Sequence, residues 1–231
     1  MKLFLRLLLL SGWCALIPCT ALAQFGKPYQ QWTAKEAEGL LIDSPWAQTR
    51  AGLIGVGRFD PATAAANTAV TVRLHSALPL RQALARLRQI KNKYDKKSDR
   101  DKAAIDAKNE PLLECPDCVD YYMVTMSPGP GSENEVSLRR MSLAQVKLNV
   151  QMRNEKGEIR ELVKLVKPKF FGDEAILLFA RFNSKGEPLI TAANRKLTIS
   201  FGRLFGWAPT PALTKFEFDV ARMTVNGQVV F

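Results

Sequence analysis

Residues 145–166 read QVKLNVQMRNEKGEIRELVKLV, and this stretch decides the fold class that we predict. Every second residue from Val146 to Met152 is apolar, which is the period of a strand with one buried face. The turn-forming residues Asn154–Gly157 link this run to a second predicted strand, Ile159–Val166. Two such runs joined by a short turn with a glycine predict a β-hairpin.

Further strands are predicted on both sides of this hairpin. Tyr121–Met126 is apolar and β-prone, and Ala175–Phe182 is a continuous apolar run suited to a buried strand. Leu197–Phe201 and Phe216–Val220 alternate again, and Asn226-Gly227 favours a tight type I′ turn. Short strands separated by turns predict an antiparallel β-sandwich or open barrel, because no helical pattern lies between the later strands.

A helix is predicted near the N-terminus of the mature chain. Thr33 and Glu36 have the spacing of a capping box, in which each side chain accepts a hydrogen bond from the other residue's backbone N–H. Apolar residues follow at helical spacing, and Ser44-Pro45 ends the helix. Because Trp32 and Trp46 flank this segment, we expect them to pack the helix onto a sheet.

The next segment adds a strand and further helical structure. Ala69–His75 alternates apolar and polar residues, and Pro79 opens a helix that continues to Lys93 with one apolar face. Residues 95–110 are polar and mixed in charge, so we expect a solvated helix or loop. The fold class predicted is α+β: mainly β, with two or three helices from the N-terminal part packed on the sheets.

The first residues have the order of a secretory signal peptide. Lys2 and Arg6 precede an apolar run, Leu7–Leu16, and Ala21–Ala23 offers small residues for cleavage. The run is too short to span a bilayer, which needs about 20 residues. We therefore expect residues 1–23 to be removed, and no later segment to cross a membrane.

The mature chain, residues 24–231, is expected to form a single β-rich globular domain. The full sequence has 33 Lys and Arg against 22 Asp and Glu, a net charge of +11, and removal of Lys2 and Arg6 leaves 11 − 2 = +9. So basic a chain attracts anionic partners such as membrane surfaces, acidic polysaccharides or nucleic acid. We expect a periplasmic or secreted protein.

Two short motifs carry a family resemblance. A W-[ST]-x-x-[ED]-A motif lies at Trp32–Ala37, where the predicted helix begins. An S-P-W-A motif lies at Ser44–Ala47, where the helix ends. The chain thereby resembles a group of exported proteins predicted from acidobacterial genomes. Two later stretches also resemble this group: a strand that leads into an Arg-Gln-Ala-Leu helix in Val72–Leu87, and an aliphatic-aromatic strand before a glycine turn in Ile176–Pro188. The resemblance implies export and a single domain, and it implies no activity, cofactor or functional residue.

Cys115-Pro116-Asp117-Cys118 is the sharpest chemical feature of the sequence. In an oxidising compartment, neighbouring thiols tend to form a disulfide, and we expect Cys115 and Cys118 to fasten the loop before a strand. A redox centre has a helix directly after such a motif, whereas Val119–Val124 is β-prone. A zinc site would need two more ligands, for which only His75 and carboxylates remain, so no metal or cofactor is expected.

Catalysis by a serine or cysteine triad would have to use His75, the only histidine. We expect His75 on the outer, solvent-facing side of its strand, next to Ser76. No G-x-S-x-G motif supplies a nucleophile. A hydrolase that uses only carboxylates remains open, because Asp and Glu are plentiful.

The predicted helix Pro79–Lys93 provides the candidate anion-binding face. It has five cations and no acid over an apolar stripe, so it can face anionic headgroups or a polyanion, or simply face water. A second basic stretch, Arg139–Lys169, has nine cations against three acids. Because aromatic residues are not interleaved with these charges, no specific nucleic-acid partner is expected. The candidate residues are Arg81, Arg86, Arg88, Lys91 and Lys93.

We therefore expect an exported binding or structural domain that is not an enzyme and that engages an anionic envelope component. The alternative is an exported enzyme, either a carboxylate-driven hydrolase or a thiol-disulfide oxidoreductase at Cys115 and Cys118. A concave pocket with close carboxylates or His75 would favour the hydrolase. Cys115 exposed at the start of a helix would favour the oxidoreductase.

Overall fold

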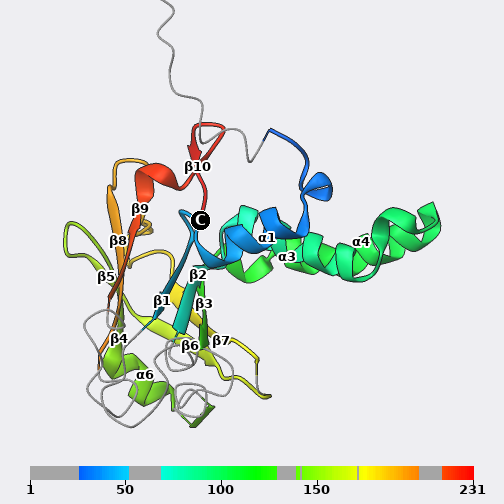
Figure 1. The fold of residues 1–231 in the computed structure, drawn as a ribbon. Helices are drawn as coiled ribbons and strands as arrows, with labels where there is room; N and C mark the ends of the chain where they lie inside the picture. Colours follow the sequence, from blue (N-terminus) through cyan, green and yellow to red (C-terminus); the bar gives the residue numbers. More distant parts are fainter. Residues whose placement is uncertain (1–25, 52–68, 129–138, 141, 171, 203–214) are drawn as a thin grey trace, which may run out of the picture.

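A computed structural model describes residues 26–51, 69–128, 139–140, 142–170, 172–202 and 215–231. In these residues a four-stranded sheet faces a five-stranded sheet, and helices extend from the other side of the five-stranded sheet (Figure 1). The predicted α+β class with antiparallel sheets is confirmed, and the described strands do not close into a barrel. The predicted signal peptide, residues 1–23, lies outside the described residues.

The five-stranded sheet has the order β1-β2-β3-β7-β6, and every neighbouring pair is antiparallel. The central strand is β3, the segment predicted from its apolar run, and β7 next to it is the predicted buried strand. The bounds are β1 Ala47–Ala51, β2 Ala69–Leu74, β3 Tyr121–Pro128, β6 Leu162–Val166 and β7 Ala175–Ala180.

The four-stranded sheet has the order β5-β4-β8-β9, again antiparallel throughout. Its strands are β4 Val150–Asn154, β5 Ile159–Arg160, β8 Lys196–Phe201 and β9 Lys215–Asp219. The small hairpin β10 (Thr224–Val225) and β11 (Gln228–Val229) follows the short helix η4 (Val220–Arg222). Asn226 and Gly227 have φ of 51° and 75°, so the predicted tight turn is confirmed.

The strand predicted from Val146 to Met152 is correct only from Val150 onward. Residues Leu143–Asn149 form a helix, α6, whose first turn is fixed by a capping box between Ser142 and Gln145. Val146 is buried and Leu148 is 83% exposed, whereas a strand would have placed both on one face. A local capping signal thus prevailed over the alternating pattern.

The predicted hairpin partner of β4 is divided between the two sheets. The turn at Gly157 forms as expected, with a φ of 85°, but only Ile159–Arg160 pairs with β4. Leu162–Val166 pairs instead with β7 of the five-stranded sheet. At the crossing, the buried Arg160 donates a hydrogen bond from Nη2 to Glu187 O at 2.9 Å. The single strand predicted from Ile159 to Val166 therefore links both layers.

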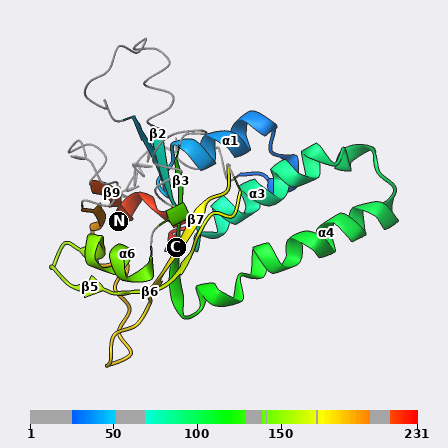
Figure 2. The same cartoon turned by 90° about the horizontal axis from the view of Figure 1, so that it is seen from below.

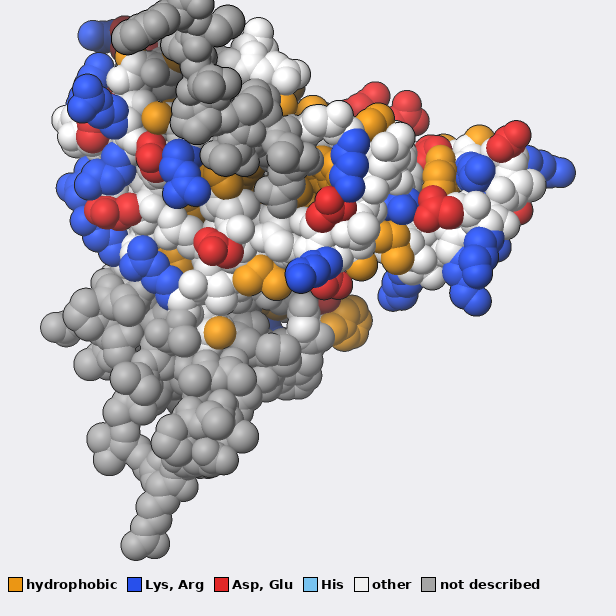
Figure 3. Space-filling model, turned by 45° about the horizontal axis from the view of Figure 1, so that its top comes forward, with side chains coloured by type: hydrophobic (Ala, Val, Ile, Leu, Met, Phe, Trp, Pro, Cys, Tyr) orange, Lys and Arg blue, Asp and Glu red, His pale blue; other side chains and the backbone are white. Residues whose placement is uncertain are grey.

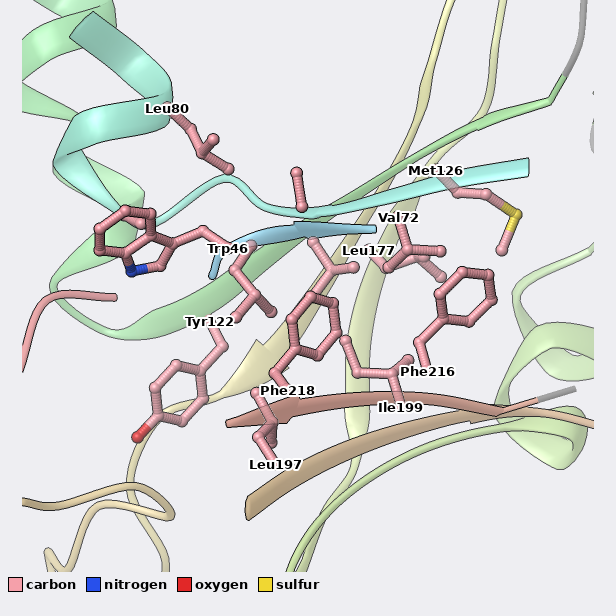
Figure 4. Close-up of a cluster of buried hydrophobic side chains, with 14 of the residues drawn as sticks. Trp46, Val72, Leu80, Tyr122, Met126, Leu177, Leu197, Ile199, Phe216 and Phe218 are labelled. Carbon is pink, nitrogen blue, oxygen red and sulfur yellow. The ribbon is translucent and has the colours of Figure 1, made fainter. Parts of the chain in front are cut away.

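The main core lies between the facing sheets (Figure 4). Val72, Met126 and Leu177 of the five-stranded sheet face Ile199 and Phe216 of the other, and all five are buried. Each fully buried aliphatic or aromatic side chain contributes roughly 1.5–3 kcal/mol. Burial between the sheets is therefore the main source of stability for the fold.

Helix α1 (Ala34–Ile42) joins the same core. The predicted capping box is present, with Thr33 N donating to Glu36 Oε2 at 2.7 Å and Glu36 N donating to Thr33 Oγ1 at 3.2 Å. Trp32 and Trp46 are both buried, as expected from their positions at the two ends of the helix. Trp46 Nε1 also donates to Val230 O at 2.6 Å, which fastens the C-terminal hairpin to the core.

Two longer helices complete the described part of the fold. Helix α3 (Leu78–Lys91) packs against α1, and α4 (Asp99–Glu114) returns along α3 after the short helix η2 (Tyr94–Lys96). Residues 95–110, expected as a solvated helix or loop, belong mostly to α4. Among the described helices, none is long and apolar enough to cross a membrane.

Candidate functional site

Residues 78–114, which we call the helical arm, project from the side of the sandwich (Figures 1 and 2). Helix α4 is the outermost element, and Asn109 is the only one of its 16 residues that is buried. Ser98 caps its first turn by accepting a hydrogen bond from Asp101 N at 3.3 Å. The arm is therefore a two-helix extension with a large polar surface.

Arg81, a candidate anion-binding residue, is buried at the base of the arm. Its guanidinium donates to Leu113 O near the end of α4 and, at 3.2 Å, to Ser76 O before α3. The last carbonyls of a helix have no partner within the helix, so a cation there satisfies them and opposes the helix dipole. The expectation that Arg81 lies on an open basic face is wrong.

Arg86 is buried for a similar reason. Its Nε donates to Trp32 O at 2.7 Å, and its Nη2 lies 3.0 Å from Asp95 Oδ2. These contacts tie α3 to the start of α1 and to the short helix at the end of the arm. The expected exposure of Arg86 is therefore also wrong, because neighbouring helices cover this side of α3.

The other three candidates, Arg88, Lys91 and Lys93, are exposed. Three exposed cations of the following segment lie near them, where the chain turns from α3 into α4. These three cations were not predicted as part of the site, because the predicted basic helix ended at Lys93. Figure 3 shows that Lys and Arg side chains and Asp and Glu side chains are both exposed along the arm. We call the six residues the basic tip: Arg88, Lys91, Lys93, Lys96, Lys97 and Arg100.

The six cations of the basic tip lie beside three exposed carboxylates, those of Asp95, Asp99 and Asp101. Asp95 is paired with the buried Arg86, and Asp99 lies 3.8 Å from Lys102. No cation of the basic tip forms an ion pair within the part of the chain that the structure describes. Clustered charges of one sign attract oppositely charged partners and speed their encounter.

The two helices of the arm are joined by polar contacts. Asp106 accepts hydrogen bonds from Gln89 Nε2 at 2.9 Å and from the Tyr94 hydroxyl at 2.6 Å. The hydrogen bond to Asp106 is the main cause that raises the pKa of Tyr94 to about 12, because ionisation would place two negative charges together. The hydroxyl therefore remains a donor at neutral pH and holds the tip against α4.

Cys115 and Cys118 are joined by a disulfide directly after the arm, around the short helix η3 (Pro116–Cys118). Cys115 is buried and is the C-terminal cap of α4. The C-terminal end of a helix dipole is negative, so it opposes the thiolate that a redox-active cysteine requires. The strand β3 follows, as the sequence predicted.

His75 is less accessible than expected. The residue is half-buried, and its Nδ1 is buried without a hydrogen-bond partner among the described residues. Burial lowers the pKa of His75 to about 4, and nearby Arg81 and Arg73 lower it further. Ser76 Oγ accepts from Met123 N at 2.6 Å, so its hydrogen bonds are with the backbone of β3. The expectation that His75 faces solvent is therefore wrong.

A surface hollow of about 320 Å³ lies where β1 meets β9, away from the arm. Glu217, one of its carboxylates, has a lowered pKa, first because the Lys215 ammonium lies 2.5 Å away. No group of three or more His, Cys, Asp or Glu among the described residues is arranged to hold a metal ion. The lining includes Asp43, Gln48, Arg50, Glu217, Asp219 and Arg222.

Comparison with protein-family models, with curated proteins and with solved structures finds no match for this chain.

Proposed function

We propose that this chain is an exported binding domain, without enzymatic activity, whose helical arm engages an anionic component of the cell envelope. The observation that carries the proposal is the basic tip: six exposed cations, with no ion pair among the described residues, at the end of an arm that projects from the sandwich. The signal-like residues 1–23 and the disulfide between Cys115 and Cys118 support export.

The chemistry of the tip favours binding through charge. The large hydrophobic side chains that are exposed in the described residues include Leu78, the first residue of the arm, and Val119, which follows the arm, but none from residues 79–118. A surface of this kind does not insert apolar side chains into a bilayer. Each Lys or Arg near an anionic membrane surface contributes about 1 kcal/mol, and the attraction weakens as salt screens it.

The two enzyme hypotheses, an oxidoreductase and a hydrolase, have less support than the binding proposal. Cys115 is buried at the end of a helix, whereas an oxidoreductase needs an accessible thiol at a helix start. The lowered pKa of Glu217 keeps this carboxylate ionised, so it is not suited to donate a proton as a general acid. Among the described features, the basic tip therefore gives the strongest support for a function.

The test compares two variants of the mature chain with equal charge loss. In the tip variant, Lys91, Lys93, Lys96 and Lys97 are replaced by Gln; in the control, the exposed Lys147, Lys156, Lys164 and Lys167 are replaced by Gln. Binding is measured by co-sedimentation with phosphatidylglycerol-containing vesicles and with lipopolysaccharide, at low and high salt. We expect the tip variant to bind at least ~10-fold more weakly than the control.

Equal losses in both variants would show that net charge, and not the tip, drives binding. Absence of salt-sensitive binding by the unsubstituted chain to both materials would overturn the proposal. Binding to vesicles alone or to lipopolysaccharide alone would identify which anionic component the tip prefers.

A further inference from the structure

The hollow between β1 and β9 contains charged side chains that have no part in the function proposed for the arm. It lies where an edge strand of the five-stranded sheet meets an edge strand of the other. Gln48 Nε2 donates to Glu217 O across this junction. The hollow is therefore built by both layers of the sandwich.

Backbone contacts fix the two walls of the hollow. On one wall, Ser44 Oγ donates to Leu40 O at 2.7 Å and accepts from Trp46 N at 3.3 Å, which holds the turn after α1. On the other wall, Asp219 accepts from Ala221 N at 3.0 Å and starts the short helix that carries Arg222. Both walls rest on buried core residues, so the hollow is formed before any ligand arrives.

Two side chains of opposite charge on the rim of the hollow have no ion-pair partner among the described residues. Asp43 and Arg222 are exposed on its rim, and neither forms an ion pair or side-chain hydrogen bond within the described parts of the chain. Arg50 lies over the ring of Phe216 at 5.2 Å and provides a second guanidinium. Glu217 is paired with Lys215, so a simple anion would meet the carboxylates of Asp43 and Asp219 here, and a simple cation would meet the guanidinium of Arg222.

We propose that this hollow binds a small dipolar molecule that carries an ammonium and a carboxylate, such as an amino acid or a dipeptide. The ammonium lies toward Asp43 and Asp219, and the carboxylate lies toward Arg222, the residue type best suited to bind it with two parallel hydrogen bonds. A volume of about 320 Å³ is at the small end of ligand sites, which limits the ligand to about two residues.

The site is independent of the proposed role of the arm, since the two surfaces share no residue. The probe is the dipeptide alanylalanine, and its affinity for the mature chain is measured by isothermal titration calorimetry. N-acetyl-alanylalanine, which lacks the ammonium, and alanylalanine amide, which lacks the carboxylate, are titrated in parallel. We expect a Kd of ~1 mM for alanylalanine and at least ~10-fold weaker binding of each blocked form, because each lacks one charge-assisted contact.

Variants locate the binding in the hollow. Arg222→Gln and Asp43→Asn are each expected to weaken binding ~10-fold without changing the Tm, because both side chains are exposed. Lys91→Gln on the arm is the matched control and should bind as the unsubstituted chain does. No binding of alanylalanine at 10 mM, equal binding of the blocked forms, or unchanged binding by both hollow variants would each overturn the proposal.

Discussion

The sandwich and the helical arm are held together by different kinds of contact. In the sandwich, apolar side chains from two facing sheets bury one another, as Met126 of β3 and Phe216 of β9 do. In the arm, α4 is held mainly by polar groups: the Arg81 guanidinium at its C-terminal end and Asp106 between Gln89 and Tyr94. Helix α3 is anchored in the apolar core by Leu80 and Ala83, whereas α4 has no buried apolar residue and depends on a few specific hydrogen bonds.

The largest expected effect tests the sandwich. Phe218 is 1% exposed on the inner face of β9, so Phe218→Ala removes an aromatic ring from the core and leaves a cavity. We expect the free energy of unfolding to fall by ~3–5 kcal/mol, measured by urea denaturation. A loss below 1 kcal/mol would contradict the view that the sheet-to-sheet core carries the stability.

The next effect tests the base of the arm. Arg81→Met keeps much of the side-chain volume but leaves carbonyl groups of Leu113 and Ser76 without their donor, at an expected cost of ~2–3 kcal/mol. Hydrogen exchange should show faster exchange in α4 than in β3 or β7. Arg88→Met, an exposed residue of the same helix, is the control and should change stability by less than ~0.5 kcal/mol. Equal losses of stability from the two substitutions would contradict a structural role for Arg81.

The smallest effect concerns the link between the arm and β3. Replacing Cys115 and Cys118 by Ser opens a loop of only four residues, and the loss of stability should be no more than ~2 kcal/mol. The reduction potential of the pair, measured against glutathione, should lie below about −300 mV. A value near −200 mV, with a reactive thiol at neutral pH, would instead favour the oxidoreductase alternative.

Local signals in the sequence predicted the local structure well. The capping box at Thr33, the buried strand from Ala175 and the turn at Asn226 each depend on residues that are close together in the chain. The division of Ile159–Val166 between two sheets depends on partners far away, so periodicity could not reveal it. Helix α6 was not predicted, because the prediction used only the alternating pattern and not the capping residues Ser142 and Gln145.

The candidate anion-binding residues were only partly predictable for the same reason. A helical pattern shows which cations share a face, but it does not show whether another element covers that face. Trp32 and the end of α4 cover Arg86 and Arg81, respectively, while Arg88 remains open. Burying an arginine is tolerated here because backbone carbonyls accept its hydrogen bonds. The three cations after Lys93 belong to the tip only because the chain turns back there.

The length of the arm has an electrostatic consequence. Helix α4 has 16 residues and therefore spans ~24 Å, since an α-helix rises 1.5 Å per residue. At physiological ionic strength the Debye length is about 8 Å, so the helix spans roughly three such lengths. The field at the tip is then set by the tip's own residues and is nearly independent of the charges on the sandwich. Substitutions on the sandwich surface can alter its net charge without altering the potential that a partner meets at the end of the arm.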